Sequence, residues 1–332
     1  MNLRENAMAI FNGEQPDFYG DFMDAMVILP DPYLLRDHAP QDGLEHPDSW
    51  GTVYIFQPGA PGPHPHVTDE NAVIKDITRW KEDLKVPSVE GLDWTMAKEV
   101  EKTVDRNEKF VGIMMGGGLF ERSHHLMGMM NAFYAYMDYP DEMKGMLREI
   151  CEWKKAALRE CKKQVNPDVV FFHDDWGSKQ NLFLPPDVWR EIIKPLHKEI
   201  VDTAHELGIL FMHHADCICQ PIVEDMVEIG IDIWQGVIAQ NDIPYIQEVT
   251  KHKLAMVGGI DGPKLDVENI TEEQIRAEVR ATIDRCCAGG RFFPGIPNGV
   301  CYREWNNSIV MDELAKYGRQ YAKEHPIVKA AS

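Results

Sequence analysis

The sequence predicts an α/β fold, a single (β/α)8 TIM-type barrel with an N-terminal loop and helical cap. From about residue 108 onward, short apolar runs alternate with longer helical patterns, which is typical of parallel βαβ units. Roughly seven or eight such units favour a closed barrel over a doubly wound sheet, because no GxGxxG motif opens a helix after the first strand. We expect one domain over residues 1–332, with residues 1–105 contributing the cap or lid and residues 106–332 most of the barrel.

The barrel elements follow one another along the chain. The expected strands are residues 22–29, 53–56, 110–115, 169–173, 209–213, 231–235, 254–257 and 291–294. The expected helices are residues 119–137, 141–164, 186–207, 220–229, 243–250, 271–288 and 304–324. The strand runs are short and apolar, whereas the helical segments are longer and amphipathic, so the two kinds of element can be told apart.

Residues 30–65 are dense in Pro, Gly, His and Asp, and we expect them to be irregular. A structureless stretch of this length in a compact protein is usually a lid or binding loop, so this one is expected to close over the barrel mouth. Residues 71–84 and 95–108 are predicted as two amphipathic helices that cover the barrel.

Charge and composition exclude several function classes. With 34 basic and 54 acidic residues the net charge is −20, which disfavours binding to nucleic acid or to anionic membrane surfaces. No apolar run approaches the ~18 residues of a membrane span, and the start, MNLRENAMAIFNGEQPD, carries charges where a signal peptide needs an apolar core. The seven cysteines suit reduced thiols. We expect a cytoplasmic protein whose partner is a small molecule or another protein.

Polar side chains gather where the predicted strands end, which is where barrel enzymes place their active sites. The strand-end candidates are His173, Asp174, Asp175, Trp176, His213, His214, Asp216, Cys217, Cys219, Gln235 and Asp261. Carboxylates and imidazoles that converge on one mouth supply metal ligands or a general acid and base. Taken singly, an Asp or His at a strand end can equally cap the following helix or be a hydrogen-bonded core residue.

The segment HHADCIC combines three types of zinc ligand. His214 and Asp216 have a spacing that can bring two donors onto one cation, and Cys217 is a further candidate. No second CxxC or HxxxH completes a structural tetrahedron, so a site here would be the open, catalytic kind. Cys217 can equally be a small buried hydrophobe. Cys301 is a weaker candidate ligand.

In order and spacing, these motifs resemble the uroporphyrinogen decarboxylase-like superfamily and, within it, the corrinoid-dependent methyltransferases. The resemblance runs through nearly the whole chain. It is carried by RENAMAIFNGEQPD, DSWG, VIKDITRWKEDLKVP, GLFERSHHLMGMMNAFYAYMDYPDEM, DDWGSKQNLFLPPDVWREIIKPLHKEI, HHADC with EIGIDIWQ, and VGGIDGP. The superfamily fold is the same barrel that the periodicity predicts independently.

The chain differs from two known motifs of this superfamily, and these differences favour one of its activities over the others. The RQAGRY-type segment with which the decarboxylase holds its porphyrinogen has no counterpart here. In the methylcobamide:thiol methyltransferases a His-x-Cys pair and a later Cys bind zinc. Here His214 is followed by Asp216, and the later position falls near Arg291 and Phe292. A harder ligand set of imidazole and carboxylate suits an oxygen-bearing substrate better than a thiolate.

The resemblance therefore implies the methyltransferase component of an O-demethylase. Such a component moves a methyl group from a small aromatic methyl ether to the Co(I) of a corrinoid protein. The implied cofactor is zinc at His214 and Asp216, with Asp174 as a further ligand, and the implied catalytic residues are Asp175 and His214. The implied substrate-binding residues are Met114, Phe120, Trp176, Gln235, Asp261 and Phe293.

Three alternatives to the O-demethylase stay open. Two are enzymes, a zinc-dependent thiol or amine methyltransferase and a decarboxylase of the uroporphyrinogen decarboxylase type. The third is a non-catalytic binding barrel, whose mouth would hold no metal. A homodimer is also compatible with the sequence.

Overall fold

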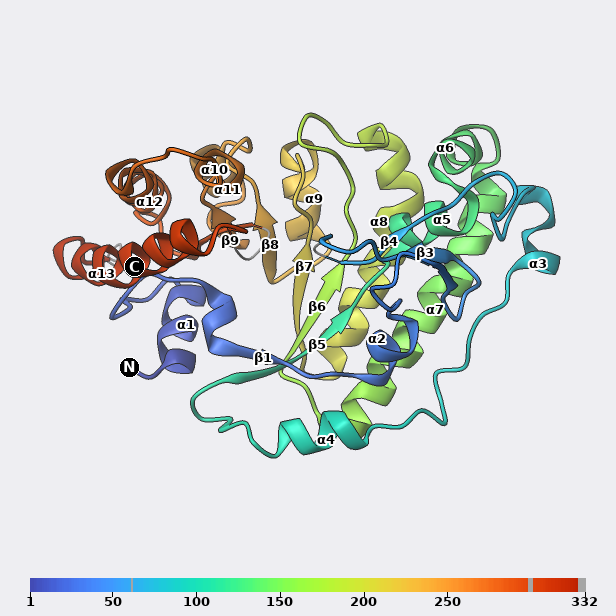
Figure 1. Ribbon diagram of the computed structural model, residues 1–332, viewed down its shortest axis with the longest axis horizontal. Coiled ribbons are helices and arrows are strands. Elements are labelled where there is room, and N and C mark those ends of the chain that lie inside the picture. The colour runs from blue at the N-terminus through green and yellow to red at the C-terminus, as the bar shows by residue number, and fades with distance from the viewer. Residues whose placement is uncertain (61, 298–300, 328–332) are drawn as a thin grey trace.

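The computed structural model describes residues 1–60, 62–297 and 301–327 and has an α/β fold built on a curled sheet of seven parallel strands (Figure 1). The strands are neighbours in the same order in which they follow along the chain, as expected for successive βα units. They are β1 (Met26–Ile28), β5 (Phe110–Met115), β6 (Val169–His173), β7 (Leu210–His214), β8 (Ile233–Val237), β9 (Ala255–Gly259) and β10 (Phe292–Gly295).

Helices surround this sheet, and α7 and α8 lie side by side on one flank (Figure 1). The predicted helix 119–137 is divided in two because Gly128 adopts a φ of 78°. Helices expected over 71–84 and 95–108 are shorter than predicted. The helices are α1 (Leu3–Phe11), α2 (Pro32–Asp37), α3 (Trp80–Asp83), α4 (Thr95–Glu101), α5 (Leu119–Met127), α6 (Met129–Asp138), α7 (Pro140–Val165), α8 (Pro186–Glu206), α9 (Val223–Glu228), α10 (Ile243–Val249), α11 (Gly262–Leu265), α12 (Glu272–Cys286) and α13 (Glu304–Glu324), with 3-10 helices η1 (Phe22–Ala25), η2 (Ile77–Arg79) and η3 (Gln220–Ile222).

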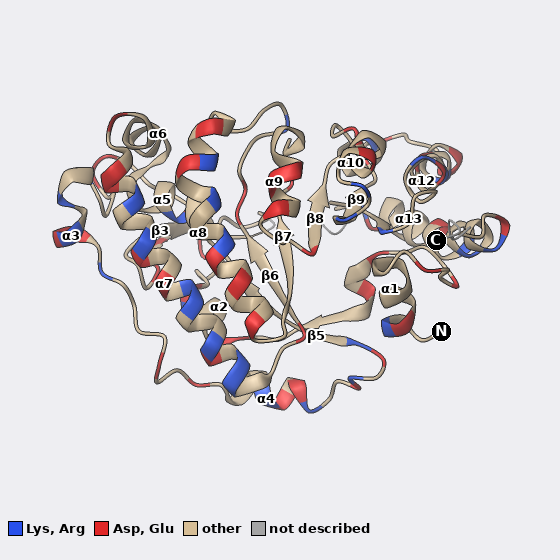
Figure 2. Cartoon of the chain, turned by 180° about the vertical axis from the view of Figure 1, so that it is seen from behind, with Lys and Arg blue, Asp and Glu red and all other residues tan. Residues whose placement is uncertain are grey.

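The long helix α7 shows how the sequence pattern positions an element. Its buried residues recur at helical spacing, including Met143, Leu147 and Ile150, and this stripe faces the core. Its other face carries charges that pair with α8, for example Lys144 with Glu191 at 2.6 Å, and both signs alternate there in Figure 2. Among the described residues, no helix has the length and apolar character needed to cross a membrane.

The closure of the sheet differs from the predicted eight-stranded barrel. Among the described residues no backbone pairing joins β10 to β1, and seven strands rather than eight are present in the curled sheet. The gap is filled by η1, whose Phe22 ring lies 5.3 Å from the rings of both Phe110 and Phe293. The expected eighth strand, 53–56, is instead part of a separate antiparallel sheet of β2 (Glu45–Pro47), β3 (Val53–Ile55) and β4 (His64–Pro65).

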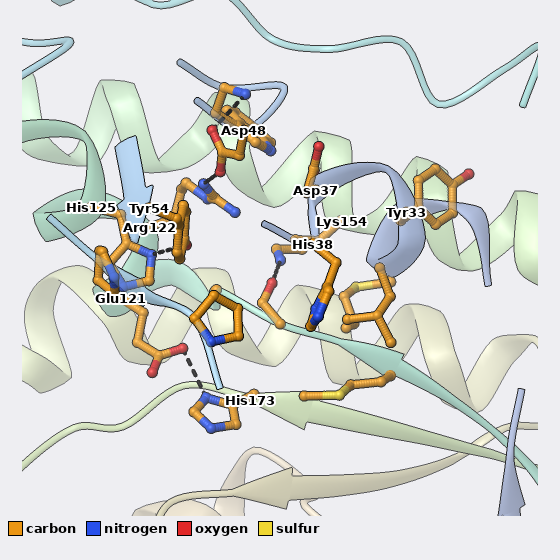
Figure 3. A pocket seen from close by; sticks show the side chains of 18 of the residues that line it. Tyr33, Asp37, His38, Asp48, Tyr54, Glu121, Arg122, His125, Lys154 and His173 are labelled. Atoms are coloured by element: carbon orange, nitrogen blue, oxygen red, sulfur yellow. Dashed lines mark hydrogen bonds and ion pairs between the residues drawn. The ribbon is translucent and has the colours of Figure 1, made fainter. Parts of the chain in front are cut away.

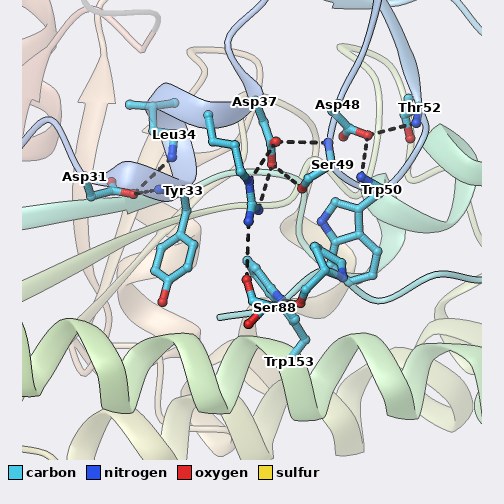
Figure 4. Close-up of polar contacts among 12 residues, drawn as sticks. Asp31, Tyr33, Leu34, Asp37, Asp48, Ser49, Trp50, Thr52, Ser88 and Trp153 are labelled. Carbon is cyan, nitrogen blue, oxygen red and sulfur yellow. Dashed lines mark hydrogen bonds and ion pairs between the residues drawn. The ribbon is translucent and has the colours of Figure 1, made fainter. Parts of the chain in front are cut away.

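The segment 30–65, expected to be irregular, therefore contains α2 and this small sheet. Polar side chains hold its turns (Figure 4). The Asp37 carboxylate accepts hydrogen bonds from the backbone N–H and hydroxyl of Ser49, at 3.0 and 2.9 Å. Asp48 accepts from the backbone N–H groups of Trp50 and Thr52, at 2.9 and 2.8 Å. Side chains that satisfy the backbone locally allow a Pro- and Gly-rich segment to be ordered without a long strand or helix.

Candidate functional site

The ends of β6 and β7 bring together three potential metal ligands, His173, Asp175 and His214. His173 and His214 are register partners in the parallel ladder, and their ring centroids are 4.4 Å apart. One ligand atom from each of the three residues lies within 4.8 Å of the other two. The cluster thus sits at the carboxyl end of the sheet, where the sequence placed the site.

Each histidine of the cluster is held through its Nδ1 atom. His173 Nδ1 is 3.0 Å from Oε2 of Glu121 on α5, and His214 Nδ1 is hydrogen-bonded to Oε1 of Gln235 on β8. A register irregularity follows Gln235 at Gly236, whose φ is 95° and where a Cβ atom would lie 3.1 Å from the backbone of Ala215. Both rings therefore keep Nε2 available, the arrangement in which a second group orients a metal-binding histidine.

The three residues of the cluster have shifted pKa values, because burial and neighbouring charges act differently on each of them. Burial opposes a charge on His173, but the Glu121 carboxylate outweighs it and raises the pKa of His173 to about 9. Burial, together with the neighbouring His173, lowers the pKa of His214 to about 4. Burial and Glu121 raise the pKa of Asp175 to about 6. The cluster therefore holds a proton on His173 and an unprotonated imidazole on His214 at neutral pH.

Asp174, expected as a metal ligand, is directed away from the cluster. It is fully buried and accepts hydrogen bonds from the backbone N–H groups of Leu119, Phe120 and Glu121 and from the indole of Trp176, at 2.9–3.3 Å. These donors occupy both carboxylate oxygens, so Asp174 caps the start of α5. The cap also positions Glu121, which holds His173.

The remaining predicted ligands lie outside the cluster. Asp216 is joined to it through its backbone N–H, which donates to Asp175 at 3.0 Å. The buried Cys217 has its sulfur 3.4 Å from that of Cys219, as a small core residue would. Cys301 lines a second cavity of about 250 Å³ together with Asp261, which caps α11 through the backbone N–H of Lys264. Neither Asp261 nor Cys301 belongs to the group of potential ligands around His214.

A cavity of about 510 Å³ lies beside the cluster, between the segment 30–65, β5, α5 and α7 (Figure 3). His173 and Glu121 form part of its wall, which places the cluster at its edge. Its apolar walls are Tyr33, Trp50, Tyr54, Met114, Met115 and Trp153, and its other polar groups include Arg122, His125 and Lys154. A volume of this size and an aromatic lining suit a small-molecule ligand.

Of the residues expected to hold an aromatic ring, Met114 lines this cavity and three others pack into the core. Phe120 stacks on Phe183, Trp176 stacks on His213 at 3.9 Å, and Phe293 packs against Phe22. All three are buried and none of them lines the large cavity, so the structure gives them a packing role. Gln235 contacts His214 and the carbonyl oxygen of Pro297 rather than the cavity.

Three residues that the sequence reasoning did not select are central to this site: Glu121, Arg122 and Lys154. His173 was among the strand-end candidates, but it was not assigned as a metal ligand. Lys154 also left a signal, because it falls within the apolar stripe of α7, where a lysine is out of place. Glu121 and Arg122 lie in a helix and become candidates only when the cap at Asp174 fixes which way α5 faces.

The cluster has the donors that zinc prefers, two imidazoles and one carboxylate. Three protein ligands with a further position open toward a cavity are typical of catalytic rather than structural zinc sites. A second group with suitable donors, Cys151, Glu152 and Glu199, lies between α7 and α8, but there Glu199 is paired with Arg148 and Lys155. The fit to a metal is therefore best at His173, Asp175 and His214.

Comparisons with known proteins agree with this architecture. A family model described as uroporphyrinogen decarboxylase (URO-D) matches residues 46–293. A solved structure of a methyltransferase from Methanosarcina mazei superposes with a TM-score of 0.66, over 96% of this chain and 99% of that chain, at 15% sequence identity. At that identity the likeness shows a common fold. A search of curated proteins finds no match.

Proposed function

Since the chain belongs to the uroporphyrinogen decarboxylase (URO-D) family, we propose that it is a methyltransferase that moves a methyl group from an aryl methyl ether to the Co(I) of a corrinoid protein. The observation that carries the proposal is the cluster of His173, Asp175 and His214 at the edge of a cavity with aromatic walls. The shared fold with a methyltransferase supports the reaction class.

In this reaction the bond between the ether oxygen and the methyl carbon breaks, a bond between that carbon and cobalt forms, and the phenolate leaving group takes up a proton. His173, Asp175 and His214 are the residues that would hold zinc. When bound, zinc would polarise the ether oxygen as a Lewis acid. Glu121 and Gln235 orient the two imidazoles through Nδ1.

The aromatic ring of the substrate is placed in the 510 Å³ cavity. Trp50, Tyr54 and Trp153 supply flat apolar contact, and Met114 and Met115 of β5 supply adaptable packing at its floor. Described residues of the segment 30–65 form the opposite wall. A water molecule bound beside the cluster is the proposed proton source for the phenolate, because Asp175 is taken up as a metal ligand in this proposal.

The test combines metal content with methyl transfer. Purified protein should contain near-stoichiometric zinc and should form methyl-cobalt, followed by its absorbance, from methoxylated phenols and Co(I) corrinoid protein. His214→Ala should lose the zinc and the transfer together. His46→Ala, a histidine of β2 that pairs with the exposed Asp42, is the matched control and should keep both.

Other outcomes identify the alternatives. If the protein binds zinc but transfers methyl groups only to or from thiols or amines, its substrate is a thiol or an amine rather than an aryl ether. Full activity of His214→Ala would refute the role of the cluster. Absence of both metal and methyl transfer in the natural chain would favour a decarboxylase or a binding protein.

A further inference from the structure

Lys154 is a buried amine that faces the large cavity without an acidic partner. Its side chain leaves the apolar stripe of α7, is 1% exposed, and its Nζ donates to the carbonyl oxygen of Gly116 at 2.7 Å. No carboxylate of the described residues lies within ion-pair distance of it. Burial, aided by the positive charge of Arg122, lowers the pKa of Lys154 to about 7. Burying a protonated amine costs free energy unless an acceptor or a negative charge compensates it, and a bound ligand could supply that partner.

Arg122 is the second cation of this wall and has unused hydrogen-bonding capacity. One terminal nitrogen pairs with Asp48 at 2.6 Å, and the guanidinium lies 5.0 Å from the centroid of the Trp50 ring. Its Nε is buried and has no hydrogen-bond partner. Like several other buried polar atoms of the described residues, this nitrogen is left for a water molecule or a ligand to satisfy.

The acidic groups around the cavity are already engaged. Glu121 pairs with His173, Asp48 pairs with Arg122, and Asp37 accepts from Ser49 and from the guanidinium of Arg36. The cavity therefore presents the amine of Lys154 without a carboxylate partner, although the chain as a whole is strongly acidic. An anionic group that entered here would meet donors and no free carboxylate.

We propose that Lys154 and Arg122 form an anion subsite of this cavity, which binds the carboxylate of an aromatic acid while its ring lies against Trp50 and Trp153. The walls favour such a ligand over inorganic phosphate, because they offer aromatic faces beside only two cations. The inference deepens the proposed function by naming its substrate class as methoxylated aromatic carboxylates, and it rests on that function only for the methoxy group.

Binding of benzoate tests the subsite without any methyl transfer. Calorimetry at neutral pH should detect benzoate binding to the full-length protein, and its uncharged analogue benzamide should bind at least about tenfold more weakly. Lys154→Met should weaken benzoate by about tenfold or more and leave benzamide unchanged. Lys155→Met is the matched control, because Lys155 is next in α7 but already pairs with Glu152 and Glu199, and it should bind benzoate normally.

The results separate the subsite from the proposed function. Equal benzoate affinity in Lys154→Met and the natural protein, or no benzoate binding at all, would overturn the subsite, while methyl transfer from an uncharged methoxybenzene would still support the function. Benzoate binding that depends on Lys154, without transfer from any methoxylated benzoate, would keep the subsite and overturn the function. Lys154→Gln serves as a second variant if the methionine side chain fills the cavity. Inorganic phosphate that competes with benzoate at equal affinity would contradict recognition of an aromatic acid.

Discussion

Replacing Asp174 by alanine is expected to lower the free energy of unfolding by about 3–5 kcal/mol. The carboxylate is fully buried and accepts from four N–H groups, three of them at the start of α5. Each buried donor left without an acceptor costs about 1–3 kcal/mol. The four donors point to one place, so a trapped water would replace part of what is lost, and the total stays below four full penalties.

Urea unfolding of the metal-free protein measures this loss, with the slope of the transition checked for constancy. Asp175→Ala is the control, because the neighbouring carboxylate accepts one backbone N–H, from Asp216, and should cost about 1 kcal/mol. The two variants should show opposite patterns. Asp175→Ala is expected to lose zinc with little loss of stability, whereas Asp174→Ala should lose stability and still bind zinc while folded. Loss of zinc without loss of stability in Asp174→Ala would refute the capping role and restore Asp174 as a ligand.

Two further predictions concern the orientation of the histidines. Gln235→Leu should weaken zinc binding by about 10- to 100-fold with little change in fold, because His214 loses the partner of its Nδ1; competition with a chelator measures this, and unchanged affinity would contradict it. In the metal-free protein the raised pKa of His173 should contribute up to about 3 kcal/mol of stability that is fully present below pH 6.5 and is lost as the pH rises through about 9. Glu121→Gln should remove most of this pH dependence, and urea unfolding at pH 6 and pH 9.5 compares the two proteins; equal slopes with pH would count against the ion pair.

The sequence predicted which strand-end segments carry site residues, but it did not predict which residue of each segment faces the site. HDDW and HHADC were recognised as site-bearing, but neighbouring residues in such a loop point in different directions. Asp174 faces α5 and Asp175 faces the cluster, although both are aspartates that follow the same strand. The family resemblance implied that the aromatic residues Phe120 and Trp176 bind substrate, but burial assigns both of them to the core.

Local sequence patterns were enough to predict the alternation of short apolar strands with amphipathic helices, the parallel sheet that follows from it, and the edge of that sheet where the polar residues gather. These are consequences of local periodicity and connection length, which depend on near neighbours in the chain. Three features came from the three-dimensional structure: residues 53–55 join a separate sheet, His173 rather than Asp174 accompanies His214, and Lys154 faces a cavity. Those outcomes depend on contacts between residues far apart in sequence, such as Glu121 with His173 and Gly116 with Lys154, which no local pattern encodes.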